Sequence, residues 1–277
     1  MAVDETHGRV FVATDSGVSV LDTGSGRLRH TIVTPEVVES MAVDPRTGHL
    51  IVSGTIPGGK GDAMAVSVLD AIGGKVLRTV CKGTNRGRPV VDGLRGRAFV
   101  FTSDIAPLSG GTTTYGNVLC IIDTRDGALL RTAPLQGIPN AAAVDDRTGR
   151  IFVTAVDAAL TSGSGSNGYL YALDEPSGKF DFATQVGIGP GYVAVDRARG
   201  RVLVLSFGPP GGGPGTLSML DEQGKMMGGS VSADVAPLSV SVDEHSGHVF
   251  VLNGGGITSY NSGNIAPSRL IVLDDTH

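Results

Sequence analysis

Short apolar runs broken by Asp and Gly recur along the whole chain. Each repeat opens with a short apolar run that ends in an Asp, a Gly follows four residues later, and a second apolar run follows the Gly. Valine, isoleucine and phenylalanine fill these runs, and no segment keeps a 3.6-residue period. The pattern predicts strands joined by tight turns, and no helix. The Asp residues that end the first runs are Asp4, Asp44, Asp92, Asp145, Asp196 and Asp243.

A third apolar run also ends in an Asp in every repeat. A Gly-containing turn and a fourth run follow, as at residues 28–33 and 76–80. Four antiparallel strands repeated at intervals of 40 to 53 residues are typical of propeller blades, which cover their apolar faces by packing on one another. We therefore predict an all-β fold, a six-bladed β-propeller of four-stranded antiparallel blades. The Asp residues that end the third runs are Asp22, Asp70, Asp123, Asp174, Asp221 and Asp274.

One repeat that runs from end to end predicts a single domain over residues 1–277. The expected blades cover about residues 1–38, 39–86, 87–139, 140–190, 191–237 and 238–277. The sixth repeat stops after Asp274, so the last blade lacks its outermost strand, which suggests a fragment of a longer protein. Strand 269–274 is then open along one edge. We expect a monomer, or weak association through this edge.

The twelve repeated aspartates are expected to serve turns rather than catalysis. An Asp side chain accepts backbone N–H bonds within a turn, and this role explains why Asp recurs in every repeat. No Gly-x-Ser-x-Gly elbow or phosphate-binding loop occurs in the sequence. We therefore assign no catalytic residue.

Charge and hydropathy narrow the choice of partner. The chain has 22 Lys and Arg against 27 Asp and Glu, and it has no basic run longer than two residues, so we expect no nucleic-acid partner. No apolar run approaches the ~20 residues of a membrane span. No signal peptide precedes the first repeat. Cys81 and Cys120 are predicted to be two free thiols, because their strands are expected to lie further apart than the ~7 Å that a disulfide spans.

The repeat resembles the YVTN family of β-propeller repeats over the whole chain. Its signature is present in altered form as Phe11-Val12-Ala13-Thr14, Phe152-Val153-Thr154-Ala155 and Val251-Leu252-Asn253. The resemblance implies a secreted or cell-surface protein. Propellers related to this family include lactonases, streptogramin-type lyases and the large subunits of quinoprotein amine dehydrogenases.

Candidate ligand-binding residues lie on the face where the second-to-third-strand loops and the links between blades meet. The long loops from Thr102 to Asn117 and from Asn253 to Ser268 are rich in Gly, Ser and Thr. Four or five residues before a first-strand Asp, the chain should reach the mouth of a central channel. The candidates on this face are Glu39, Arg86, Arg88, Asn140, Tyr192, Tyr115, Tyr260 and Asn261.

Two functions fit these residues. The first is a noncatalytic recognition or scaffold propeller that binds a protein or glycan partner through the long loops. The alternative is a metal-dependent enzyme of the lactonase or lyase kind, with its site at the channel mouth. There, Glu39 and Asn140 would offer the oxygen ligands that a hard divalent cation prefers. No other cofactor is expected, and the sequence leaves open whether the protein is an enzyme.

Overall fold

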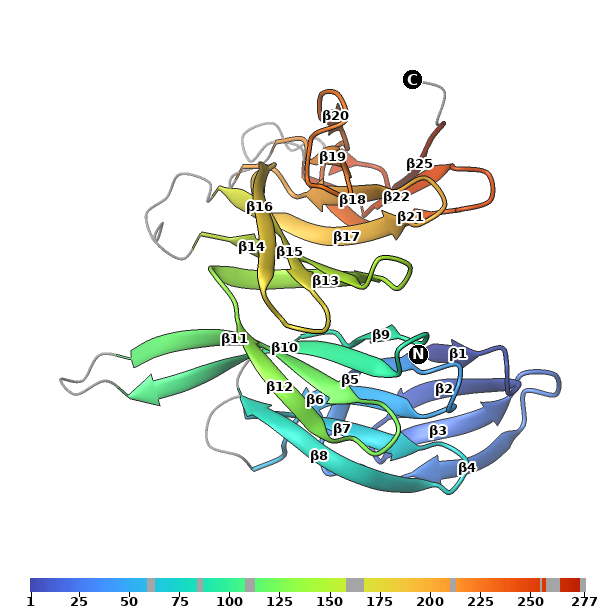
Figure 1. Ribbon diagram of the computed structural model, residues 1–277. Helices are drawn as coiled ribbons and strands as arrows, with labels where there is room; N and C mark the ends of the chain where they lie inside the picture. The colour runs from blue at the N-terminus through green and yellow to red at the C-terminus, as the bar shows by residue number, and fades with distance from the viewer. Residues whose placement is uncertain are drawn as a thin grey trace. The chain divides into compact units, whose positions relative to one another are not determined.

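The computed structural model describes residues 1–58, 63–83, 87–107, 113–157, 167–209, 213–254, 256–257 and 265–274. Within these ranges every regular element is a β-strand (Figure 1). The all-β prediction is therefore confirmed. No helix long and apolar enough to cross a membrane occurs in these ranges. The chain forms two compact units, Met1–Leu135 and Gln136–His277.

The first unit holds three sheets, here called blades 1 to 3. Blade 1 consists of β1 (Ala2–Asp4), β2 (Arg9–Thr14), β3 (Gly17–Asp22) and β4 (Leu28–Ile32). Blade 2 consists of β5 (Val37–Val43), β6 (Leu50–Thr55), β7 (Met64–Asp70) and β8 (Lys75–Gly83). Blade 3 consists of β9 (Val90–Asp92), β10 (Arg97–Pro107), β11 (Thr113–Asp123) and β12 (Leu129–Pro134).

The second unit holds blades 4 to 6. Blade 4 consists of β13 (Ile138–Asp145), β14 (Arg150–Val156), β15 (Gly168–Asp174) and β16 (Phe180–Val186). Blade 5 consists of β17 (Pro190–Asp196), β18 (Arg201–Ser206), β19 (Thr216–Asp221) and β20 (Val231–Ser232). Blade 6 consists of β21 (Pro237–Val242), β22 (Val249–Asn253) and β25 (Arg269–Leu273), beside a short hairpin of β23 (Gly256–Ile257) and β24 (Ile265–Ala266).

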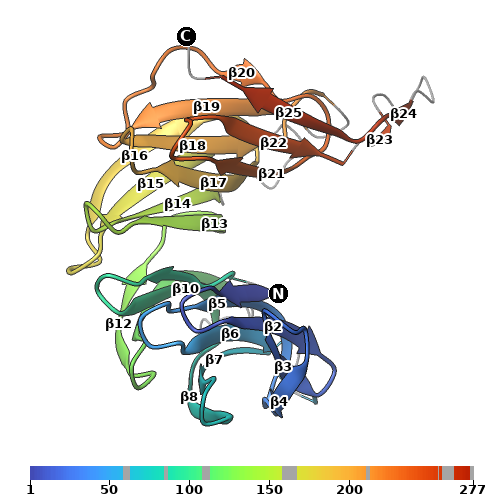
Figure 2. The same cartoon turned by 90° about the vertical axis from the view of Figure 1, so that its right-hand side faces the viewer.

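In each blade the strands lie side by side in chain order, and every pair is antiparallel. Five blades have four strands, and the sixth has three in the order β21-β22-β25 (Figure 2). The prediction of six propeller blades with an incomplete last blade is confirmed.

Aspartate side chains hold the turns, as predicted. Asp4 accepts a bond of 3.1 Å from the backbone N–H of His7, and Asp145 accepts one of 3.0 Å from that of Arg147. The Gly four residues after Asp4 has a φ of 63°, a left-handed conformation that favours glycine. The invariant spacing between Asp and Gly thus reflects one turn geometry repeated in every blade.

The apolar core lies between neighbouring blades of each unit. Phe11, Val20 and Ile32 of blade 1 pack with Leu50 and Leu69 of blade 2, and all are fully buried. A similar cluster joins blades 4 and 5, and another joins blades 5 and 6. Because a strand alternates its side chains between two faces, each inner blade of a unit contributes to two such clusters.

Blade 3 departs from the prediction of a long loop. β10 and β11 pair continuously from Arg97↔Asp123 to Pro107↔Thr113, so most of the predicted loop from Thr102 to Asn117 is an extended hairpin (Figure 1). Threonine and tyrosine favour a pleated backbone, and three of the residues on the returning arm, 113–115, are of these types.

The prediction of two free thiols is wrong. Cys81 and Cys120 form a disulfide, with their Cα atoms 6.5 Å apart. The ladder between β7 and β8 shifts register from Met64↔Gly83 to Val66↔Val80, which inserts an extra residue into β8. Cys81 lies in this bulge with a φ of 51°. A bulge re-aims a side chain, and here both cysteines enter the core between blades 2 and 3.

Candidate functional site

In four blades the first strand has a bulge at the residue five places before its Asp. The register of blades 2, 4, 5 and 6 shifts at this point, between Val38 and Ser40 in blade 2 and at the equivalent places in the others. One residue in each blade is thereby taken out of the ladder. These residues, the bulge row, are Glu39, Asn140, Gly191 and Leu238. All but Gly191 are exposed.

In the first unit, the structure places two of the predicted residues. Glu39 lies in the β5 bulge and accepts a hydrogen bond of 2.6 Å from the Thr55 hydroxyl, which fixes one carboxylate oxygen. Arg88 is exposed in the link that precedes β9. Arg86 lies outside the described residues.

In the second unit, Asn140 and Tyr192 lie on β13 and β17, the first strands of two consecutive blades. The Asn140 amide Nδ2 donates to the Pro190 carbonyl at 2.9 Å, two residues from Tyr192. The Tyr192 ring meets Phe207 edge-on, with centroids 5.7 Å apart. A Cβ added to Gly191 would lie 2.3 Å from the Phe207 ring, which explains the glycine at this bulge.

The structure does not describe the side chains of three predicted residues on the long loops. Tyr260 and Asn261 lie outside the described residues. Tyr115 is in β11, with its backbone opposite Ile105, and its side chain is outside what the structure describes. Their role in binding stays a prediction.

The oxygen ligands for a cation are sparse in the part of the chain that the structure describes. No group of three or more His, Cys, Asp or Glu is placed there to hold a metal. In the second unit, the bulge row supplies one amide, one glycine and one leucine, whereas hard cations take six or more oxygens. The divalent cation stays a prediction.

A pocket in blade 4 is lined by aromatic and polar residues that the sequence did not predict to form a site. It has a volume of about 300 Å³, and its lining includes Asp157, the residue directly after β14. Its lining residues are Gln136, Gly137, Asp157, Tyr169, Tyr171 and Ala183.

The two tyrosines of this blade 4 pocket form a layered platform. The rings of Tyr169 and Tyr171 stack at 6.0 Å with an interplanar angle of 26°. Tyr171 also meets Phe180 edge-on at 5.7 Å, and only 7% of it is exposed. Burial raises the pKa of Tyr171, and the nearby Tyr169 and Asp157 raise it further, so its phenol stays protonated at neutral pH. The buried Tyr171 ring thus gives rigid support to the partly exposed Tyr169 ring.

Comparison of the repeats explains why this pocket belongs to blade 4. Tyr171 stands three residues before its third-strand Asp, where blade 2 has Ser67. In blade 2 the Ser67 hydroxyl donates to the buried Glu36 carboxyl at 3.1 Å. In blade 4 this position and the one two residues before it hold the rings of Tyr171 and Tyr169. Aromatic residues both three and five places before the Asp occur only in this repeat, and that was the missed signal.

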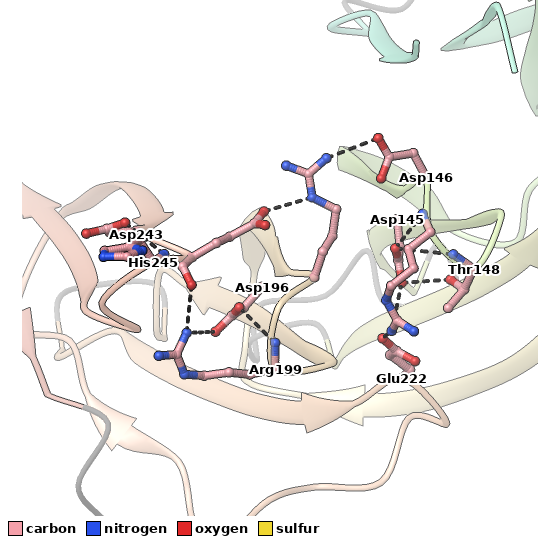
Figure 3. Close-up of polar contacts among 11 residues, drawn as sticks. Asp145, Asp146, Thr148, Asp196, Arg199, Glu222, Asp243 and His245 are labelled. Carbon is pink, nitrogen blue, oxygen red and sulfur yellow. Dashed lines mark hydrogen bonds and ion pairs between the residues drawn. The ribbon is translucent and has the colours of Figure 1, made fainter. Parts of the chain in front are cut away.

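The opposite end of the blades in the second unit carries a network of ion pairs (Figure 3). Arg197 lies between Asp146 at 3.1 Å and Glu244 at 2.8 Å, and so links blades 4, 5 and 6. Arg199 donates to the Glu244 carbonyl, and Arg147 pairs with Glu222. The side chains of these pairs are partly exposed, and each charge has a partner of opposite sign. We therefore interpret the network as a structural connection between blades.

Comparisons with known proteins show the fold alone. No protein-family model matches the chain, and no curated protein matches it. A hydrazine synthase structure from Kuenenia stuttgartiensis has a TM-score of 0.63 at 13% identity, covering 91% of this chain and 75% of that one. A functionally unknown protein from Desulfotomaculum acetoxidans has a TM-score of 0.60 at 11% identity, covering 95% and 78%. A eukaryotic initiation factor has a TM-score of 0.55 at 11% identity, covering 99% of this chain and 64% of that one.

Proposed function

We propose that this protein is a noncatalytic recognition propeller that binds a glycan in the blade 4 pocket. The observation that carries the proposal is the stacked pair Tyr169 and Tyr171 beside Asp157 and Gln136 in one open hollow of about 300 Å³. Gln136, Gly137 and Asp157 of this pocket lie in the link before β13 and directly after β14, and connecting segments on a rigid scaffold usually carry binding groups.

The chemistry of the lining suits a sugar. A sugar ring presents an apolar C–H face, which packs on an aromatic ring, and hydroxyl groups around its edge. The Tyr169 ring supplies the aromatic surface. The Asp157 carboxylate accepts hydrogen bonds, and the Gln136 amide both donates and accepts them. A few polar groups around an apolar surface are the usual composition of a small-molecule site.

The same lining argues against glycoside hydrolysis. That reaction requires two carboxyl groups flanking the bond to be cleaved, one of which acts as an acid. Among the described residues that line the pocket, Asp157 is the one that carries a carboxylate. Binding without cleavage is therefore the function that these residues support.

A secreted or cell-surface location is part of the proposal. The likeness of the repeats to the YVTN family supports it, and so does the Cys81–Cys120 disulfide, because disulfides persist mainly in oxidising compartments. We likewise propose that the chain belongs to the YVTN family.

Binding to immobilised neutral oligosaccharides, followed by calorimetry on the ones retained, tests this function. Tyr169→Ala should weaken binding about tenfold or more, because the stacking surface is lost. Tyr169→Phe should keep most of the affinity, and Phe250→Ala serves as the matched control because that partly exposed ring lies in β22, outside the pocket. Retention of no oligosaccharide, or equal affinity of Tyr169→Ala and the wild type, would refute the proposal.

A further inference from the structure

Among its described lining residues, the blade 4 pocket has one charged group, the carboxylate of Asp157. This residue directly follows β14, and its backbone N–H donates to the Asn167 carbonyl at 3.2 Å, which fixes the backbone beside the start of β15. The side chain lines the same pocket as the rings of Tyr169 and Tyr171. A carboxylate is thus held next to two aromatic rings.

The charge of Asp157 acts on these rings. Burial is the main cause of the raised pKa of Tyr171, and the nearby Tyr169 and Asp157 raise it further. The carboxylate therefore lies near the phenol, because the interaction between charges weakens with distance. The face of an aromatic ring also carries partial negative charge. The pocket combines two features that attract a cation, a carboxylate and the faces of tyrosine rings.

The segments that supply the lining residues add no positive charge. Residues 132–146, 151–178 and 180–196 contain no Lys or Arg. Arg150 lies opposite Asp174 at one end of the ladder between β14 and β15, whereas Asp157 follows the other end, at the pair Val156↔Gly168. A cationic group in the pocket would therefore come from the ligand rather than from these segments.

The net charge of the second unit has the same sign as the pocket. Residues 136–277 contain 14 Asp and Glu against 8 Lys and Arg, whereas residues 1–135 contain 13 against 14. The negative charge of the chain thus belongs to the unit that holds the pocket. Such a field attracts cations and repels anions, so it disfavours an acidic sugar.

We propose that the blade 4 pocket selects an amino sugar whose amine is free and protonated. This inference rests on the proposed glycan-binding function and names the kind of sugar that the site prefers. The volume of about 300 Å³ is at the lower end of the range for small-molecule sites, so the pocket takes a single ring.

Each part of such a ring has a partner in the pocket. Its apolar face packs on Tyr169, and its ammonium group donates a charge-assisted hydrogen bond to the Asp157 carboxylate. The Gln136 amide donates to, or accepts from, a ring hydroxyl. A neutral sugar keeps the stacking contact but has no charge to pair with Asp157. An N-acetylated sugar lacks that charge as well.

Three series of monosaccharides test this preference. Glucosamine, galactosamine and mannosamine are each compared with the neutral parent hexose and with the N-acetyl form, so that the members of a series differ only at the amine position. Calorimetric titration is carried out in low salt at about pH 6, where a carboxyl group is ionised and an amine is protonated. In at least one series the amine should bind about tenfold tighter or more than both uncharged forms. High salt should reduce this preference.

Asp157→Asn removes the charge and keeps the shape of the side chain. It should abolish the preference for the amine and leave the affinity for the neutral parent almost unchanged, which also shows that the variant is folded. Asp15→Asn is the matched control, because Asp15 is exposed and directly follows β2 of blade 1, as Asp157 directly follows β14. This control removes the same charge outside the pocket and should change neither affinity.

The outcomes separate this proposal from the glycan-binding function. Equal affinity for charged and uncharged forms in every series would overturn the choice of an amino sugar, while the function would stand. A preference that survives Asp157→Asn would overturn it too. So would competition by ethylamine as strong as that of the amino sugar, because the ring would then contribute nothing. Absence of binding by every sugar would refute the function, and the amino-sugar proposal with it.

Discussion

Removing the Cys81–Cys120 disulfide tests how blades 2 and 3 are held together. The bond joins residues separated by 39 positions, from the outermost strand of one blade to the third strand of the next. The chain-entropy relation for a loop of this length predicts about 4 kcal/mol of stabilisation, because the cross-link restricts the unfolded chain. That is a large part of the 5–15 kcal/mol by which proteins are typically stable.

Urea unfolding of five samples measures this contribution: the oxidised protein, the reduced protein, Cys81→Ala, Cys120→Ala and the double variant. Each single change breaks the bond, so each should lose nearly as much stability as the double change. Cys120 is 1% exposed, so truncation to Ala adds a smaller cost from lost packing. Hydrogen exchange of β8 and β11 should speed up before that of β14 and β15, because the bond lies in the first unit.

Additive losses in the two single variants would contradict this reasoning, since they would show that each sulfur acts through packing alone. A reductant that leaves the urea midpoint unchanged would contradict it as well. Either result would mean that the apolar contacts between blades 2 and 3 hold this junction without the covalent bond.

Three further changes probe other parts of the structure. Burial raises the pKa of Glu36, so its ionisation opposes folding as pH rises; Glu36→Gln should raise the urea midpoint at pH 7, and this gain should vanish near about pH 4. Gly54→Ala should cost about 2 kcal/mol or more in thermal unfolding, because its Cβ would lie 2.0 Å from the Val37 carbonyl oxygen, whereas Gly229→Ala should have little effect. Arg197→Ala breaks two partly exposed ion pairs and should cost less than about 1 kcal/mol, a difference that should shrink in high salt.

The sequence by itself determines the blades. Strands, turns and their order follow from local preferences: alternating apolar residues make the strands, and Asp4 with Gly8 makes a turn that needs no distant partner. Repetition of this pattern six times leaves stacking of sheets as the way to bury both apolar faces. The three strands of the last sheet are equally visible, since the sixth repeat contains three apolar runs.

Only the tertiary structure decides which side chains from different blades meet. Cys81 reaches Cys120 because a bulge turns it into the next blade, and a bulge is an irregularity that the repeat pattern does not encode. Gly229 looks like an ordinary loop glycine in the sequence, and only the packing of blade 5 on blade 6 makes it part of the lining of a pocket. Tyr169 and Tyr171 are regular strand residues in the sequence, and only the neighbouring link makes them the floor of a site. Such contacts depend on how one sheet is staggered against the next, and local sequence preferences do not determine that offset.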